Sequence, residues 1–219
     1  MDVVIAGGHG KIALLLTRLL SDRGDRVTGI VRNPAHPADV EAAGGKAFVL
    51  DLEQADPIAI ADVLAGADAG VFAAGAGPGS GAARKETVDR GAAVKFAEAA
   101  ERTGVRRHLQ VSAMGLHRAD DPSVDEVFRA YLRAKAAAEE DLRSRDLDWT
   151  ILRPGRLTDA PGTGLVEVGP SVRPGSVSRA DVAAVLAALL DHPGTSGKNL
   201  EVVEGKTTVA EAVSAVEQS

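Results

Sequence analysis

The sequence of 219 residues contains no cysteine, which excludes disulfide bonds, thiolate metal ligands and cysteine nucleophiles. Aromatic residues are scarce, with one tryptophan, one tyrosine and four phenylalanines, so the core must be built mainly from alanine, valine and leucine. No apolar run reaches the roughly 20 residues that a membrane helix needs, and no secretory signal precedes the first apolar segment. We therefore expect a soluble, cytoplasmic protein without a membrane partner.

Positive charge is also limited. The formal net charge is −6, and there is no basic run and no stretch in which basic and aromatic residues alternate, which argues against a nucleic-acid partner. The five histidines do not have the spacing of metal ligands, so no metal site is expected. With 45% apolar residues, the chain suits a single α/β domain that is a monomer or a homodimer.

The first 33 residues predict a strand, a glycine turn, a helix and a second strand. Asp2–Ala6 is a short apolar run, Gly7–Gly10 is the turn, Lys11–Leu20 is rich in leucine, and Arg26–Val31 is the second strand. Two strands joined in this way by a helix form a βαβ unit, in which the strands are parallel.

Glycines in this turn follow the looser form of the dinucleotide-binding pattern. Gly7, Gly10 and Ala13 have the spacing G-x-x-G-x-x-A, directly after a strand and directly before a helix. A pyrophosphate can approach the N-terminal amides of the helix only where no side chain blocks the turn, and the helix dipole favours its charge. The turn therefore predicts nucleotide binding, with a tight turn that binds no ligand as the alternative.

Strands and helices alternate along the rest of the chain. Apolar runs predict strands at 46–50, 69–74, 108–112, 148–152 and 199–203, and helical patterns lie at 38–43, 57–64, 85–103, 123–145, 178–190 and 208–219. An S-x-x-E capping box at Ser123–Glu126 is expected to open the helix at 123–145. Because parallel strands need crossover connections, the pattern predicts an α/β fold with a doubly wound parallel sheet of the Rossmann type. Residues 1–219 are expected to form one domain, in which 155–178 and the C-terminal segment make a small substrate lobe.

Ligands of open parallel sheets bind at the carboxyl ends of the strands. At the end of the second strand, a cofactor with a free ribose 2′-hydroxyl usually meets an acid, but Val31-Arg32-Asn33 stands there instead. Arginine pairs well with a phosphate and cannot accept from a hydroxyl, so NADP is favoured over NAD, and a solvent-exposed Arg32 is the alternative. Asp51 could bind the adenine edge or cap the next helix, and the sequence does not separate these roles.

A second informative segment is the helix expected after the capping box. Tyr131 and Lys135 lie four residues apart on its apolar stripe, where an unpaired charge is costly. An ammonium beside a phenol stabilises the phenolate, so the tyrosine can act as a general acid or base. With Ser112, at the end of a predicted strand, these residues form the expected catalytic group, and a packed tyrosine beside a surface lysine is the alternative.

Taken together, five segments resemble the atypical short-chain dehydrogenases/reductases, NAD(P)-binding proteins that include members similar to NADH-flavin reductases and to epimerases. They are Gly7–Ala13, Val111–Ser112, Tyr131–Lys135, Trp149–Gly155 and Ser178–Asp181. The similarity extends over nearly the whole chain, and the glycine pattern and the Leu-Arg-Pro-Gly segment are its most specific parts.

The resemblance implies which residues bind the cofactor. The glycine turn and its amides would hold the pyrophosphate, Arg32 the 2′-phosphate, and Asp51 the adenine. Residues at the next strand ends would border the adenosine ribose and the nicotinamide. The full expected set is Gly7, Gly8, His9, Gly10, Lys11, Ile12, Arg32, Asp51, Leu52, Ala74, Gly75, Pro154 and Gly155.

The resemblance also implies the catalytic roles. Ser112 would orient a carbonyl, Tyr131 would give or take its proton, and Lys135 would bind the nicotinamide ribose and lower the pKa of Tyr131. Two residues depart from the family pattern. His9 occupies a turn position more often filled by a small residue, and Asp89 stands where extended members of the family place an asparagine.

Two further segments are expected to have no catalytic role. The glycine-rich segment 75–81 is predicted to be a rim loop, because no Lys-Ser/Thr pair follows it as in a phosphate-binding loop. The acidic run Glu139-Glu140-Asp141 is predicted to be a solvated helix face.

The sequence thus predicts an NADP-dependent oxidoreductase that transfers a hydride between nicotinamide and a small carbonyl, quinone or flavin-like acceptor. Two alternatives stay open. One is a regulator that senses NADP without turnover, and the other is an epimerase or dehydratase that keeps its cofactor bound.

Overall fold

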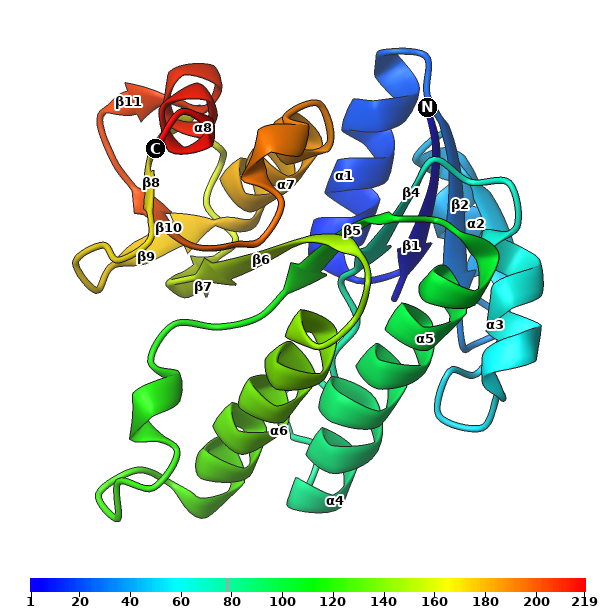
Figure 1. The fold of residues 1–219 in the computed structure, drawn as a ribbon, viewed down its shortest axis with the longest axis horizontal. Coiled ribbons are helices and arrows are strands. Elements are labelled where there is room, and N and C mark those ends of the chain that lie inside the picture. The colour runs from blue at the N-terminus through cyan, green and yellow to red at the C-terminus, as the bar shows by residue number, and fades with distance from the viewer. Residues whose placement is uncertain (78) are drawn as a thin grey trace.

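The computed structural model describes residues 1–77 and 79–219. In these residues, a nine-stranded sheet has the order β11-β8-β10-β6-β5-β4-β1-β2-β3 (Figure 1). Its parallel part is made of β1 (Asp2–Ala6), β2 (Arg26–Val31), β3 (Lys46–Val49), β4 (Ala69–Phe72), β5 (Arg107–Val111), β6 (Asp148–Pro154) and β10 (Lys198–Glu204). The predicted strands and the doubly wound Rossmann-type sheet are therefore confirmed.

The segment after β6 adds strands in two different ways. β8 (Leu165–Gly169) runs antiparallel to β10, and β11 (Thr207–Thr208) pairs with β8, so both extend the main sheet. β7 (Arg156–Thr158) and β9 (Ser176–Ser178) form a separate two-stranded sheet beside the end of β6. Residues 155–178 thus lie at the carboxyl edge of the sheet without a core of their own.

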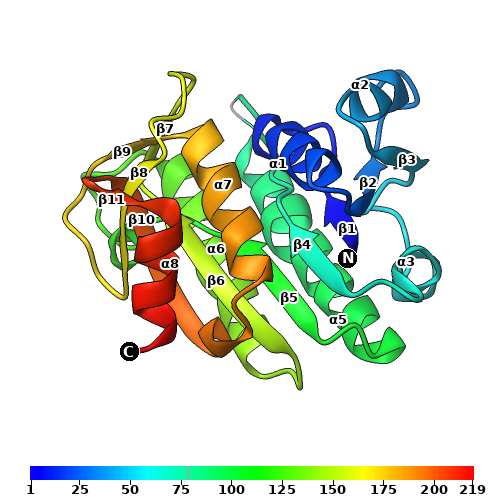
Figure 2. The same cartoon turned by 90° about the horizontal axis from the view of Figure 1, so that it is seen from above.

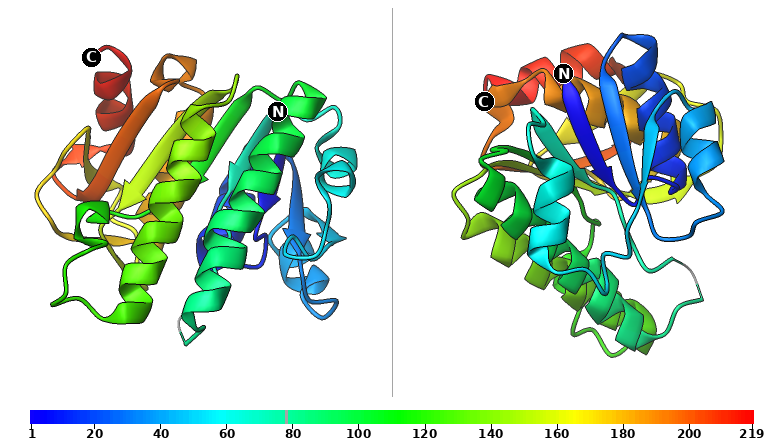
Figure 3. Two further views of the ribbon diagram at one scale, coloured as in Figure 1. Left: turned by 60° about the horizontal axis from the view of Figure 1, so that its bottom comes forward. Right: turned by 90° about the vertical axis from the view of Figure 1, so that its right-hand side faces the viewer.

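Helices cover both faces of the sheet (Figures 2 and 3). One face carries α1 (Lys11–Asp22), α2 (Pro37–Ala42), α7 (Arg179–Leu190) and α8 (Val209–Glu217), and the other carries α3 (Pro57–Leu64), α5 (Ala93–Thr103) and α6 (Glu126–Arg143). Two short 3₁₀ turns lie at Leu116–Arg118 and Pro193–Thr195. Among the helices described, none combines the length and the apolar character needed to cross a lipid bilayer.

Successive residues of the central strands are buried on opposite faces. On β1, Val3 and Ile5 belong to the core under α1 and α7, whereas Val4 and Ala6 belong to the core under α3 and α5. A parallel strand with both faces covered has this near-continuous apolar sequence. Because both faces are buried, these strands could be recognised in the sequence as short apolar runs, without alternating polar residues.

The start of α6 differs from the prediction. Asp125, not Ser123, is the N-cap, and its side chain accepts a hydrogen bond from the Phe128 amide. Ser123 instead donates its hydroxyl to the Asp121 carboxylate, 2.6 Å away, in the preceding turn. The capping-box prediction was wrong because the helix begins at Glu126, so that Asp125, three residues before Phe128, has the spacing of an N-cap.

The helix expected at 85–103 is not a regular α-helix throughout. It begins as the short α4 (Ala82–Arg84), continues as a π-helical turn, η1 (Lys85–Ala92), and becomes α5 only at Ala93. The loop expected before it, at 75–81, includes Pro78, which lies outside the described residues. A π-turn changes which side chains face inward, and here it turns both Lys85 and Asp89 into the protein.

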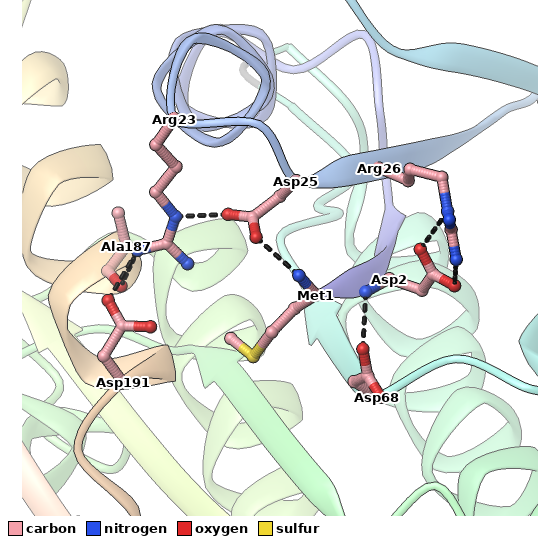
Figure 4. A network of polar contacts seen from close by, with 8 residues as sticks. All are labelled: Met1, Asp2, Arg23, Asp25, Arg26, Asp68, Ala187 and Asp191. Atoms are coloured by element: carbon pink, nitrogen blue, oxygen red, sulfur yellow. Dashed lines mark hydrogen bonds and ion pairs between the residues drawn. The ribbon is translucent and has the colours of Figure 1, made fainter.

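Charged side chains at the amino-terminal edge of the sheet are paired with one another (Figure 4). The terminal ammonium of Met1 lies 2.6 Å from Asp25, which is also paired with Arg23, and the guanidinium of Arg23 reaches Asp191 of the α7 end. This network joins the βαβ unit to α7 at the end of the sheet opposite the glycine turn.

Candidate active site

The glycine turn after β1 has no room for side chains. Gly7 has φ +79°, and a Cβ placed on it would lie 2.6 Å from the Cα of Ala74. A Cβ on Gly8 would lie 2.7 Å from the Cα of Gly29 on the adjacent strand. The first residue needs glycine for its backbone conformation and for space, and the second for space alone.

The helix after the turn begins with open amides. Within the described residues, no side chain caps α1 at Gly10, and its first turn carries no acid. The amides of Lys11 and Ile12 therefore point out of the helix start, where the helix dipole favours an anion. This turn presents uncapped amides with no side chain over them, and it fits the pyrophosphate of a dinucleotide.

A cleft of about 300 Å³ opens beside the turn at the carboxyl ends of β2, β3 and β4. Eight of the thirteen predicted cofactor residues line it: Gly7, His9, Gly10, Arg32, Asp51, Leu52, Ala74 and Gly75. Gly8, Lys11 and Ile12 belong to the adjoining turn and helix start, and Pro154 and Gly155 lie farther along the edge of the sheet, at the end of β6. The structure thus brings the expected adenosine side together in one cleft.

Asp51 has a structural role in addition to lining this cleft. Its Oδ1 accepts a hydrogen bond from the Glu53 amide at 3.0 Å, and its carbonyl accepts from Gln54 and Ala55. The next helix, α3, is capped by Asp56 instead. Asp51 therefore shapes the loop after β3 and does not cap the helix, which leaves its second carboxylate oxygen for a ligand.

Glu53, in that same loop, binds three side chains at the far end of the cleft. Its Oε2 accepts from Arg32 at 2.9 Å and from Arg84 at 2.6 Å, and its Oε1 accepts from the Thr87 hydroxyl at 2.7 Å. The hydrogen bond from Arg84 is the main cause that lowers the pKa of this carboxyl. Glu53 and Arg84 were not found from the sequence, because their pairing joins loops that are 31 residues apart.

The predicted catalytic residues lie just after β5 and along α6. Ser112 follows β5 and is only 4% exposed, yet its Oγ has no hydrogen-bond partner in the part of the chain that the structure describes. Lys135 on α6 is buried, and its Nζ donates to the Val111 carbonyl at 3.1 Å. A buried hydroxyl without a partner beside a buried ammonium is typical of a site that takes a polar ligand.

Asp89 connects this pair of residues to the cleft. Its Oδ1 lies 3.4 Å from the Lys135 ammonium, and its Oδ2 accepts from the Ala76 amide at 3.2 Å, in the loop after β4. Both side chains of the ion pair are at most 5% exposed. The carboxylate therefore supplies the counter-charge of a buried lysine and holds the loop that closes the cleft, a role that a neutral asparagine would fill only in part.

Tyr131 does not have the lowered pKa that the sequence suggested. Burial raises the pKa of its hydroxyl, and the Asp89 carboxylate raises it further. The Lys135 ammonium is 5.9 Å from the centre of the tyrosine ring and is paired with Asp89, so it brings little net positive charge to the phenol. The predicted lowering is wrong, because neither the burial of the phenol nor the counter-ion of the lysine was foreseen.

The acidic run on α6 is not a uniformly solvated face. Glu139 is fully buried, and its carboxylate pairs with Arg143 of its own helix and with Arg153 of β6, each at 2.5 Å. The prediction fails for this residue because it lies four positions after Lys135, on the same inward face. Arg153, part of the Leu-Arg-Pro-Gly segment, therefore fixes α6 against the end of β6.

The two residues that follow Arg153 make close backbone contacts. The Gly155 amide donates to the Val202 carbonyl at 2.9 Å, and a Cβ on Gly155 would lie 2.4 Å from the carbonyl oxygen of Gly175. The Pro154 carbonyl accepts from Met114 at 3.1 Å, in the loop after β5. These bonds bring the ends of β5 and β6 together beside Ser112.

The start of α1 also contacts the segment after β7. Lys11 Nζ lies 2.6 Å from Asp159, which Arg179 of α7 also binds at 2.7 Å. Both Lys11 and Asp159 are largely exposed, so this contact is weak on its own. It nevertheless places the segment 155–178 next to the glycine turn, as a substrate lobe over the cofactor would require.

Comparison with known proteins points to one family. A family model described as NAD(P)H-binding matches residues 7–193. The chain is 36% identical to the uncharacterised sugar epimerase YhfK of Bacillus subtilis over 214 residues. The aligned region covers 97% of this chain and 99% of that protein.

Solved structures of similar proteins have the same fold along their whole length. A Bacillus halodurans protein provisionally named a NAD-dependent epimerase/dehydratase is 36% identical, with a TM-score of 0.90 over 98% of this chain and 99% of that one. The oxidoreductase ylbE of Lactococcus lactis is 27% identical, with a TM-score of 0.86 over 100% and 98% of the two chains.

Proposed function

The chain belongs to the NAD(P)H-binding family and to its atypical short-chain dehydrogenase/reductase type, and on this premise we propose that it is an NADP-dependent oxidoreductase. The reaction is a hydride transfer between the cofactor and a small carbonyl, quinone or flavin-like acceptor. The observation that carries the proposal is the buried Lys135, which Asp89 ties to the loop at the mouth of the cofactor cleft.

The cofactor is held from the turn outward along the cleft. Amides at the start of α1 bind the pyrophosphate, and Asp51 and Leu52 border the adenine. Arg32 lines the same cleft and is about half exposed, so its guanidinium can turn part of its donor edge toward a 2′-phosphate. The arginine at this position, where an acid would select NAD, supports NADP as the preferred cofactor.

The catalytic residues act at the nicotinamide end. When bound, the nicotinamide supplies or accepts the hydride. The unpartnered Ser112 hydroxyl donates to the acceptor oxygen, and Lys135 binds ribose hydroxyls while it keeps its bond to the Val111 carbonyl. Because its pKa is raised, the Tyr131 hydroxyl stays protonated at neutral pH and serves as the acid that protonates the reduced acceptor.

Side chains around Tyr131 suit a flat, apolar acceptor. The ring of Phe128 stacks on that of Tyr131 with 5.7 Å between their centres, and Phe128 and Val127 are 46% and 38% exposed. An apolar surface of this kind next to a proton donor favours a quinone or flavin-like ring over a sugar. The segment 155–178 would cover the acceptor from the other side.

The substitution Tyr131→Phe tests the enzymatic role. It removes the proton donor and leaves the stacked ring, so we expect kcat to fall on the order of 10²- to 10⁴-fold for carbonyl acceptors. Oxidation of NADPH, followed at 340 nm across a panel of aldehydes, quinones and flavins, is the measurement.

Binding of NADPH provides the control for this substitution, because the phenol hydroxyl does not contribute to the adenosine end. The variant should therefore bind NADPH as the wild type does. Unchanged turnover in Tyr131→Phe would remove Tyr131 from the mechanism. An absence of turnover by the wild type with every acceptor, although it binds NADPH, would favour a cofactor-sensing regulator.

Epimerase activity is the second candidate, because the name of the Bacillus subtilis relative indicates it. An epimerase would oxidise and then reduce its substrate with no net change in cofactor absorbance. Sugars or nucleotide sugars that exchange a carbon-bound proton with deuterated solvent in the presence of the protein would support this activity over net reduction.

A further inference from the structure

Glu53 is placed where a bound 2′-phosphate would lie between two arginines. Arg32 comes from the end of β2 and Arg84 from α4, and both guanidinium groups donate to the same oxygen, Oε2 of Glu53. Thr87 donates to the other oxygen, so both oxygens of the carboxylate accept hydrogen bonds from side chains at this end of the cleft. All three donors belong to loops or helix starts that border the cleft or its rim.

The side chain of Glu53 is less exposed to solvent than those of the two arginines. The Glu53 side chain is 15% exposed, whereas Arg32 and Arg84 are 54% and 39% exposed. The carboxylate is thus the buried centre of the group, and the arginines reach over it from outside. Two positive charges and one negative charge leave a net charge of about +1 at the end of the cleft.

We propose that Glu53 is an internal substitute for the 2′-phosphate and that its charge sets the preference between NADPH and NADH. This inference rests on the proposed NADP-binding function. In the structure, the carboxylate holds the two arginines together. When NADPH binds, its 2′-phosphate takes over donors of Arg32 and Arg84, and the carboxylate keeps the bond to Thr87.

This exchange of partners weakens the discrimination between the cofactors. A phosphate monoester carries a charge of about −1.5 to −2 at pH 7, so it competes with Glu53 for the arginines and is repelled by it. NADH has no such group, and Glu53 can keep both arginines when NADH binds. The chain is therefore less selective for NADPH than its two arginines alone would make it.

The substitution Glu53→Gln tests this proposal. Glutamine keeps the shape and the acceptor oxygen but removes the negative charge. We expect the dissociation constant of NADPH to fall roughly three- to tenfold, while that of NADH changes less than about twofold. Both constants are measured by isothermal titration calorimetry at fixed ionic strength, because salt screens the interaction.

Two further variants complete the experiment. Glu86→Gln removes one negative charge from η1, next to Thr87, where Glu86 pairs with Arg90 at the surface, and it should leave the ratio of the two constants unchanged. Arg84→Gln should weaken NADPH binding several-fold more than NADH binding, because it removes a direct phosphate donor. Thermal denaturation of each variant verifies that it is folded.

The outcomes separate this inference from the function on which it rests. If both cofactors bind the wild type and Glu53→Gln raises the dissociation constant of NADPH, Glu53 positions the arginines and does not compete with the phosphate. That result overturns the inference and leaves the proposed function standing. The same holds if the ratio of constants is unchanged. If neither cofactor binds the folded wild type, the proposed function and the inference fall together.

Discussion

At the scale of residues, Lys135 shows how a buried charge determines the properties of its neighbours. Burial lowers the pKa of this ammonium below its ordinary value of 10.5, and the Asp89 carboxylate opposes that shift. The same carboxylate raises the pKa of Tyr131. One acid thus acts on both groups, because it opposes the loss of the lysine's charge and the ionisation of the tyrosine.

The Asp89→Asn variant should lose stability in a way that depends on pH. Without its counter-ion, the pKa of Lys135 in the folded state falls further, so the unfolded state binds more protons between that value and 10.5. Stability then rises with pH in this window. Because burial lowers the pKa of Lys135 in the wild type too, the deficit of the variant shrinks only between the two folded-state pKa values, by up to about 1.4 kcal/mol per pH unit.

Urea unfolding at pH 7 and pH 9.5 measures this effect. Breaking a buried ion pair by removing one partner costs about 3–5 kcal/mol, so the deficit at pH 7 should be of this order. A deficit that is equal at both values would mean that removing Asp89 does not change the protonation of Lys135 in the folded state between them, and would contradict the role of Asp89 as its counter-ion.

Which site residues could be predicted depended on whether the signal was local. Gly7, Gly10 and Arg32 lie within one βαβ unit, and the sequence indicated them because their spacing along the chain reflects the turn itself. Glu53 and Asp89 are important through partners that are 31 and 46 positions away, and no local pattern marks such pairs.

At the scale of elements, the buried Glu139 joins α6 to β6. Its carboxylate binds Arg153 next to the Leu-Arg-Pro-Gly end of β6, and thereby fixes the helix that carries Tyr131. Strand and helix positions were predicted well, because the alternation of apolar runs and helical stripes is a property of each segment. The π-turn η1 and the N-cap of α6 were not, because both depend on which of several competing hydrogen bonds the packed protein favours.

The Glu139→Ala variant should be destabilised, since it removes a fully buried carboxylate and leaves the partly buried Arg153 without its partner. We expect a loss of about 3 kcal/mol in the free energy of unfolding. The neighbouring Glu140 is exposed, so Glu140→Ala should change stability by less than about 0.5 kcal/mol. Denaturant unfolding of the two variants side by side is the measurement. Equal and small losses would show that the ion pair between α6 and β6 adds no net stability.

At the scale of the whole molecule, the cofactor would contact nearly every element at the carboxyl edge of the sheet. Its adenosine end would lie among the loops after β2, β3 and β4, and its nicotinamide end near β5, β6 and α6. A ligand that binds only the folded state stabilises it in proportion to the logarithm of its concentration over its dissociation constant.

NADPH at about 100 times its dissociation constant should therefore raise the melting temperature by about 5–10 °C. NADH at the same concentration should raise it less, and Arg32→Gln should reduce the difference between the two cofactors, because only Arg84 then remains as a phosphate donor. Differential scanning fluorimetry measures the melting temperature of the wild type and of Arg32→Gln, each with NADPH and with NADH. Equal shifts with NADPH and NADH in the wild type would contradict the role of Arg32.

The most direct test of the account is a crystal structure of the protein with NADPH. We predict that the pyrophosphate lies on the amides after Gly7, that the 2′-phosphate contacts Arg32, and that the nicotinamide faces Ser112 and Tyr131. A dinucleotide bound outside the glycine turn, or a nicotinamide ring that points away from Tyr131 and Lys135, would contradict it.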